Sequence, residues 1–274
     1  MKTGVYSSVS GRIWYALLVV FCTAVLIFLV APALVIVPLS FNSESFFSFP
    51  MPGLSLRWYE EFFTSERWLT ALRNSVFVAT ISTASATVLG TVAAFGLTRP
   101  QFPFRGLVTA ILLLPMIVPL IISAVGLYFF YAWSGLLNSF TGLILAHIAL
   151  ATPFVVITVT AALSGFDDSL WRAASSLGAP PLTTFRKVVL PLIFPGVASG
   201  ALFAFIVSFD EVIVVLFIVG AEQRTLPRQM FSGIREQISP TITAAATFLI
   251  VLSIAVFTAI ELLRRRSERL NRQP

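Results

Sequence analysis

The stretch DDSLWRAASSLGAPPLTTFRKVVLP, from Asp167 to Pro191, is a polar and basic interruption of an otherwise apolar chain. Asp167 or Asp168 is placed to cap a helix start, because a carboxylate there accepts free backbone N–H groups at the positive end of the helix dipole. Gly178 is placed to end that helix, since glycine enters the left-handed conformation at low cost. The pattern therefore predicts a short helix followed by a turn.

A second helix is expected after the turn. Pro180-Pro181 can open it, because the N–H that proline lacks has no partner in a first turn, and Pro191 and Pro195 are expected to mark its far end. In the first helix the apolar residues repeat at i, i+3, i+4 and i+7, which places them on one face; they are Leu170, Ala173, Ala174 and Leu177. The segment reads as a helix–turn–helix between two membrane spans that contacts something outside the membrane.

The composition is that of an integral membrane protein. Hydrophobic residues make up 57% of the 274 and charged residues 11%, whereas soluble domains carry about 25% charge. The single cysteine, Cys22, excludes an intrachain disulfide and a cysteine-based metal site. The net charge of +6 comes from basic residues at span ends, where they fix orientation, so we expect no nucleic-acid partner.

Six apolar stretches are long enough to cross a bilayer, given about 20 residues for a hydrocarbon core of ~30 Å. They lie near residues 14–39, 75–97, 107–131, 136–163, 196–219 and 242–263. Alternation with a period of two is absent, so we predict helices, which satisfy their own backbone hydrogen bonds in lipid. Residues 1–274 are expected to form one all-α membrane domain, with residues 164–195 as the loop that holds the helix–turn–helix.

The first stretch has two interpretations. Lys2 and Arg12 precede an apolar run, and Ala31-Pro32-Ala33 resembles a signal-peptidase site. The run is longer than a signal-peptide core of 7–15 residues, and apolar character continues beyond Ala33. We favour an uncleaved membrane anchor.

The orientation follows from the distribution of Lys and Arg. With the N-terminus inside, 12 basic residues fall in inside segments and 6 in outside segments. Both termini and the Asp167–Pro191 segment are therefore predicted to be cytoplasmic.

Two outer segments contain further amphipathic sequence. SLRWYEEFFTSERWL, residues 55–69, is rich in aromatic residues and predicts a helix lying along the outer surface. In the second segment, residues 221–240, Thr225 is a candidate cap, and an apolar stripe is expected at Met230, Phe231, Ile234 and Ile238. That helix either packs on the outer ends of the spans or receives an extracytoplasmic partner, and the two are compatible.

Motifs for catalysis are missing from the sequence. A P-loop needs a glycine-rich loop followed by Lys, so that backbone N–H groups and the amine bind the phosphates, and neither of the two lysines, Lys2 and Lys187, follows such a loop. One His and one Cys do not support zinc or thiol chemistry. We predict that the chain is not an enzyme, has no catalytic or metal-binding residues, and binds no cofactor of its own.

Charged and ionisable residues within spans are costly and are functional candidates by default. Asp210 and Glu211 lie in the fifth predicted span and His147 in the fourth, at similar depth. They either hydrogen-bond neighbouring helices or line a path for a cationic solute. Adjacent helical residues differ by about 100°, so Asp210 and Glu211 cannot both face one path. Pro115 and Pro119 are expected to break or kink the third span.

The Asp167–Pro191 segment also resembles a family motif. Ala173-Ala174, three residues, Gly178, nine residues and then Val188-x-Leu190-Pro191 are similar to the E-A-A-x3-G-x9-I-x-L-P motif of binding-protein-dependent ABC importer permeases. Arg172 stands where this family usually has Glu, and Val188 where it has Ile. The first departure puts in doubt any salt bridge that the Glu would make with an ATPase.

The resemblance covers most of the chain and is greatest for spermidine/putrescine-type permeases, for example in FAFIVSFDEVIVVLFIVG, residues 203–220. It implies the type I importer permease (MetI-like) fold with six spans in a bacterial inner membrane. The implied partners are a second permease subunit, two cytoplasmic ATPase subunits that bind ATP and Mg²⁺, an extracytoplasmic solute-binding protein, and membrane lipid.

Residue roles follow from the resemblance in the same way. The residues that would couple to the ATPase are Leu170, Trp171, Arg172, Ala173, Ala174, Leu177 and Gly178. The solute path, inferred above from the ionisable residues within predicted spans and not from the resemblance, would include Asp210, Glu211 and His147. The expected solute is a polyamine or related small amine. The same machinery could instead import an anion, a sugar, an iron complex or an amino-acid derivative, and a third hypothesis is a secondary transporter that acts alone.

Overall fold

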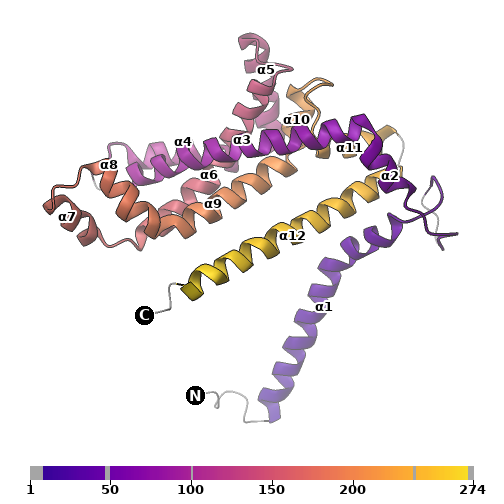
Figure 1. Ribbon diagram of the computed structural model, residues 1–274, viewed down its shortest axis with the longest axis horizontal. Coiled ribbons are helices and arrows are strands. Elements are labelled where there is room, and N and C mark those ends of the chain that lie inside the picture. The colour runs from indigo at the N-terminus through magenta and orange to yellow at the C-terminus, as the bar shows by residue number, and fades with distance from the viewer. Residues whose placement is uncertain (1–8, 47–49, 100, 237–238, 271–274) are drawn as a thin grey trace. The chain divides into compact units, whose positions relative to one another are not determined.

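In the computed structural model the protein is helical, and the structure describes residues 9–46, 50–99, 101–236 and 239–270 (Figure 1). Within these ranges the β pairing is limited to one isolated bridge, Asn42 with Leu54. The elements in order are α1 (Val9–Leu39), α2 (Arg57–Thr64), α3 (Glu66–Leu97), α4 (Arg105–Ile117), α5 (Leu120–Ser134), α6 (Phe140–Ser164), α7 (Asp168–Ser176), α8 (Pro181–Thr184), the π-helix η1 (Phe185–Val189), α9 (Leu190–Asp210), α10 (Ile213–Ile218), α11 (Leu226–Glu236) and α12 (Thr241–Leu270). The all-α class predicted from the sequence is confirmed.

The chain forms two compact units, residues 1–65 with 233–274, and residues 66–232. The single domain predicted from the sequence stays a prediction. Four helical stretches in the described residues are long and apolar enough to cross a membrane: residues 10–39, α3, α6, and the continuous run from α8 to α9. A fifth crossing results if α4 and α5 together count as one span.

The core of the second unit is formed by α3, α6 and α9, which pack against one another along their lengths (Figure 1). Small residues permit this close packing. A Cβ atom added at Gly90 of α3 would lie 2.7 Å from the Val155 Cβ atom of α6. A Cβ at Gly200 of α9 would overlap the Thr158 hydroxyl and lie 3.0 Å from the Val155 Cα atom. Since lipid tails are as apolar as the side chains, such close van der Waals contact is a main source of helix association in a bilayer.

The third predicted span is two helices rather than one. α4 ends at Ile117, two residues after Pro115, and α5 begins at Leu120 with Pro119 as its N-cap. The two axes meet at 103°. The predicted break at the prolines is confirmed.

The fifth predicted span, residues 196–219, also differs from expectation. Its helix begins far earlier, because α8, η1 and α9 are continuous, and it ends at Asp210. Glu211 has an extended backbone, with φ −68° and ψ 120°, and a separate short helix, α10, follows. α10 packs against α5, where Val214, Val215 and Ile218 are buried in a second apolar cluster.

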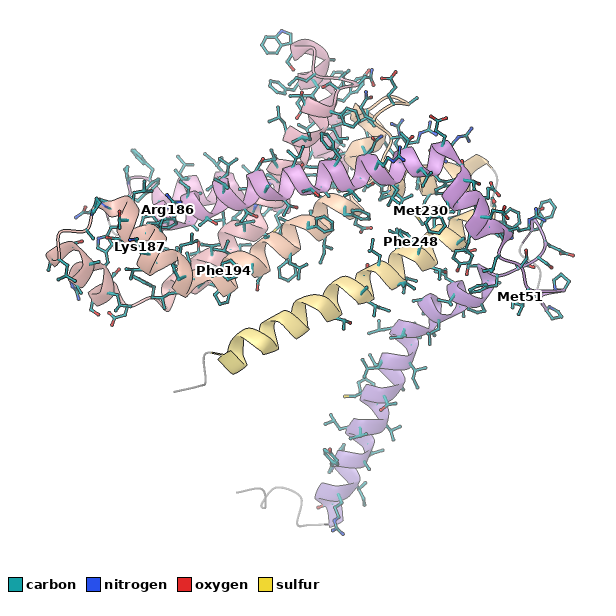
Figure 2. The ribbon with its side chains drawn as sticks, viewed as in Figure 1. Met51, Arg186, Lys187, Phe194, Met230 and Phe248 are labelled. Carbon is teal, nitrogen blue, oxygen red and sulfur yellow. The ribbon has the colours of Figure 1, made fainter. Side chains whose placement is uncertain are left out.

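The first unit contains α1, α2 and α12. The surface helix expected over residues 55–69 is wrong in extent: α2 ends at Thr64, and Glu66 already belongs to α3. Trp58 and Phe62 of α2 are buried. The Trp58 indole donates a hydrogen bond to the Asn42 carbonyl at 2.7 Å. Phe62 packs on Phe248, with ring centroids 5.5 Å apart; Phe248 is labelled on α12 in Figure 2.

The glycine packing predicts the effect of one methyl group. Gly200→Ala places a Cβ against Thr158 and should lower the free energy of unfolding by about 1–3 kcal/mol, as overpacking does. Gly126→Ala is the matched control, since a Cβ there meets nothing within 4 Å. Denaturant titration in mixed micelles measures both. Equal unfolding free energies for the two variants would show that α6 and α9 do not pack as described.

Candidate functional site

The start of α7 is fixed by its own sequence. Asp167 is the N-cap, and its side chain accepts a hydrogen bond from the Ser169 N–H at 2.8 Å. Hydrogen bonds from Ser169 hold the pKa of the Asp167 carboxyl below its usual value, and the charge of Arg172 contributes in the same direction. Of the two candidate caps, Asp167 is therefore the one used, and it stays ionised at neutral pH.

The end of α7 is equally local. Gly178 has φ +80°, the left-handed conformation expected for it. The Gly178 N–H donates to the Ser175 carbonyl at 3.0 Å, and the Ala179 N–H to the Ala174 carbonyl at 3.1 Å, which together form a Schellman motif. Pro180 caps α8 and Pro181 opens it, as predicted.

Pro191 and Pro195 do not end the second helix, contrary to expectation. Both lie inside α9, which runs on to Asp210. The wider π turn of η1 ends at Val189, two residues before Pro191, and the Leu190 N–H bonds to the Phe185 carbonyl. A π turn inside a helix changes the local bonding pattern, which lets the helix pass a proline that lacks an N–H.

α7 presents two different faces. Trp171 and Ala174 are half-buried, whereas the remaining residues of α7 are exposed. Leu170 is 42% exposed and Leu177, just after the helix, is 88% exposed. Ala173 lies between them on the same face. The residues predicted to couple to an ATPase are thus divided: Leu170, Arg172, Ala173, Leu177 and Gly178 face outward, and Trp171 and Ala174 face the protein's own core.

The inward face of α7 contacts an aromatic cluster. The ring centroids of Trp171 and Phe95, on α3, lie 5.6 Å apart. The ring centroids of Phe95 and Phe185, in η1, lie 4.9 Å apart. All three pack on the buried cluster of α3, α6 and α9, which includes Val159, Val189 and Ile193. Figure 2 shows Arg186 and Lys187, both exposed, on the adjoining turn of helix.

The two acids of the predicted path have different surroundings. Glu211 is 7% exposed, and its carboxylate accepts a hydrogen bond from the Val214 N–H at 2.7 Å. Glu211 therefore caps the start of α10 from the short non-helical segment between α9 and α10. Asp210, the last residue of α9, is exposed. The prediction that the two acids cannot both face one path stays a prediction. In the structure the helix break at Glu211, rather than the rotation between neighbouring residues of one helix, separates them.

His147 has a structural partner. It is 1% exposed, and its Nδ1 atom lies 2.8 Å from the hydroxyl of Ser208, which is also buried. Its Nε2 atom is buried with no hydrogen-bond partner among the described residues. The contact between His147 and Ser208 thus joins α6 to α9 about one turn before the helix break at Glu211. His147 is buried, whereas Asp210 is exposed.

Comparison with known proteins decides the family. A family model described as "Binding-protein-dependent transport system inner membrane component" matches residues 86–272. The chain belongs to this family. It is an inner-membrane component of a transport system, and the matched residues include α7 and every candidate site residue above.

Two curated relatives match nearly the whole chain of this inner-membrane component. The spermidine/putrescine transport system permease protein PotC of Haemophilus influenzae is 34% identical over 247 residues, which are 90% of this chain and 96% of the relative. The putrescine transport system permease protein PotI of Escherichia coli is 34% identical over 247 residues, 87% of each chain. A crystal structure of a bacterial ABC transporter for the import of alginate aligns with a TM-score of 0.74 at 17% identity, covering 96% of this chain and 99% of that one. This likeness supports the MetI-like fold.

Residues 222–226, in the second segment predicted to lie outside, are fixed to the N-terminal part of α3. The Asn74 side-chain amide donates to the Glu222 and Arg224 carbonyls at 2.8 and 3.0 Å. Thr225 is not the side-chain cap of α11 as predicted; its hydroxyl is buried and unpaired among the described residues. Ser75 of α3 accepts the Leu226 N–H at 2.8 Å instead.

The apolar stripe expected on α11 is only partly as predicted. Phe231 and Ile234 are exposed, Met230 is half-buried, and Ile238 lies outside the described residues. The buried positions of α11 are Leu226 and Gln229. Sequence reasoning also missed Phe95, Phe185 and Arg99 as neighbours of α7. No local signal identifies them, because contacts between residues this far apart in the chain depend on the packing of α3 and α6.

Proposed function

We propose that this chain is one of two membrane subunits of an ATP-driven, binding-protein-dependent importer for a polyamine or related small cationic amine. The observation that carries the proposal is α7: a capped helix with an exposed apolar face, in a membrane component that has no P-loop. A transport system of this family needs an energy source outside the present chain, and α7 is a suitable docking element for it. ATP and Mg²⁺ would bind to two ATPase partners.

We further propose the topology that this function requires. Six crossings are obtained if α1, α3, the bent pair α4–α5, α6, α9 and α12 each count as one. The 12-to-6 distribution of basic residues then places both termini and α7 in the cytoplasm. A second permease subunit would complete the path, and an extracytoplasmic solute-binding protein would deliver the solute to the opposite face.

The solute class rests on charge and on relatives. Both curated relatives described above are named for putrescine or spermidine and putrescine. Asp210 offers an exposed carboxylate at the break in the fifth span, which suits an ammonium group better than an anion. An importer with the same machinery for another solute is the alternative, and uptake competition with spermidine, putrescine, trehalose and sulfate distinguishes them.

The docking role of α7 predicts the effect of one substitution. Ala173→Arg puts a long charged side chain in the middle of the exposed apolar face and should prevent the ATPase from copurifying with the permease complex. Ser175→Arg is the matched control, because Ser175 is exposed on a different side of the same helix. The amount of ATPase retained after affinity purification, relative to membrane-inserted permease, is the measurement. Full retention by Ala173→Arg would rule out docking at this face.

The two acids should separate into a transport role and a structural role. Asp210→Asn should reduce spermidine uptake by roughly tenfold, equivalent to about 1.4 kcal/mol, and leave the free energy of unfolding unchanged. Glu211→Ala leaves the buried Val214 N–H without its acceptor and should lower the free energy of unfolding by about 1–3 kcal/mol. Glu211→Gln keeps an acceptor oxygen and is the control. Normal spermidine uptake by Asp210→Asn would remove this residue from the path.

A further inference from the structure

We propose that Arg99 is a positioning residue that links the docking helix α7 to the C-terminal end of α3, so that α7 moves together with the membrane core. The link consists of Arg99, Phe95 and Trp171 and is called the Arg99 clamp below. The proposal rests on the proposed function for the role of α7, whereas the clamp itself rests on contacts within residues 66–232.

The clamp is a three-way contact. The guanidinium carbon of Arg99 lies over the Phe95 ring and over the Trp171 ring, 4.3 Å from each ring centroid. The two rings also touch, with centroids 5.6 Å apart. A cation over an aromatic face is attracted by the ring quadrupole, most strongly for tryptophan. One cation therefore holds a side chain of α3 and a side chain of α7 at once.

Two backbone hydrogen bonds fix the position of Arg99. Its N–H donates to the Gly96 carbonyl at 3.0 Å, and its carbonyl accepts the Phe102 N–H at 3.1 Å. This turn directly follows α3, and Phe95 lies four residues before Arg99, a spacing that brings side chains together on a helical turn. Trp171 of α7 is the one member of the clamp that is distant in sequence from the other two.

Trp171 is the main contact that α7 makes with the core. All residues of α7 are exposed except Trp171 and Ala174, and alanine has only one methyl group to pack. Without the clamp, α7 would be held chiefly by its short connections to α6 and α8. With it, a displacement of α7 is passed to α3 through Trp171 and to α9 through the continuous helix from Pro181.

The contact chemistry favours arginine over lysine. A planar, delocalised and weakly hydrated guanidinium can lie on two ring faces, whereas an ammonium is a compact and strongly hydrated charge. Arg99→Lys should retain part of the clamp. Arg99→Met keeps an apolar side chain of similar length but removes the cation.

The experiment measures the position of α7 directly in the full chain. Cys22 is the only cysteine, so a Cys22→Ser chain can carry spin labels at Val92 of α3 and Ser176 of α7, both exposed. Their distance distribution in nanodiscs should broaden with Arg99→Met and with Trp171→Leu, broaden less with Arg99→Lys, and stay narrow with the control Arg105→Met, an exposed arginine at the start of α4. The double variant Arg99→Met/Trp171→Leu should add little to either single variant, because both remove the same contact.

A second readout tests coupling in the complete complex. Arg99→Met should lower the amount of spermidine imported per ATP hydrolysed on the order of threefold, with the ATPase still bound, and Arg99→Lys should recover part of it. An unchanged distance distribution in Arg99→Met overturns the clamp. A broadened distribution with unchanged coupling overturns the positioning role. If the wild-type complex does not couple ATP hydrolysis to uptake, the proposed function fails, while the distance measurement still decides the clamp.

Discussion

The close approach of α6 to α3 and α9 is the contact on which the rest of the membrane unit depends. Gly90 and Gly200 both face Val155, and at either position a side chain would collide with the neighbouring helix. In a bilayer, helices gain little from hiding apolar surface, because the surrounding lipid is apolar too. Close backbone contact therefore has to supply the association, and glycine is the residue that permits it.

This packing also determines where the functional segments lie. The buried cluster between α3, α6 and α9 includes Phe95 and Phe185 at its border, and these side chains receive Trp171 of α7. In the same core, His147 of α6 contacts Ser208 of α9, just before the point where α9 ends. α7 and the helix break at Glu211 are thus attached to one tightly packed core, a suitable arrangement for passing movement from one to the other. Arg172, which replaces the Glu usual in this motif, points outward, and within the chain it supports the ionised Asp167 cap.

Features that depend on neighbouring residues could be predicted from the sequence, and those that depend on distant ones could not. The Asp167 cap, the Gly178 turn and the Pro181 start were all predicted, because each follows from the conformational preference of one residue and its nearest neighbours. The break at Glu211 was missed, since no proline or glycine marks it. At the break the buried Glu211 carboxylate accepts the Val214 N–H, a contact that the sequence pattern does not reveal. Thr225 was expected to cap α11, but the Leu226 N–H is bound instead by Ser75, which lies 151 residues earlier in the chain. Ala174 was predicted to share one face with Ala173, but Ala174 is half-buried, as is Trp171, whereas Ala173 is exposed.

The central claim is that this inner-membrane component is driven by ATP through α7. The most direct test is radiolabelled spermidine uptake by vesicles that contain the purified complex with its binding protein. The account predicts uptake that requires ATP hydrolysis and persists when an ionophore collapses all ion gradients. Uptake that continues without ATP and stops with the ionophore would contradict it and would favour a secondary transporter.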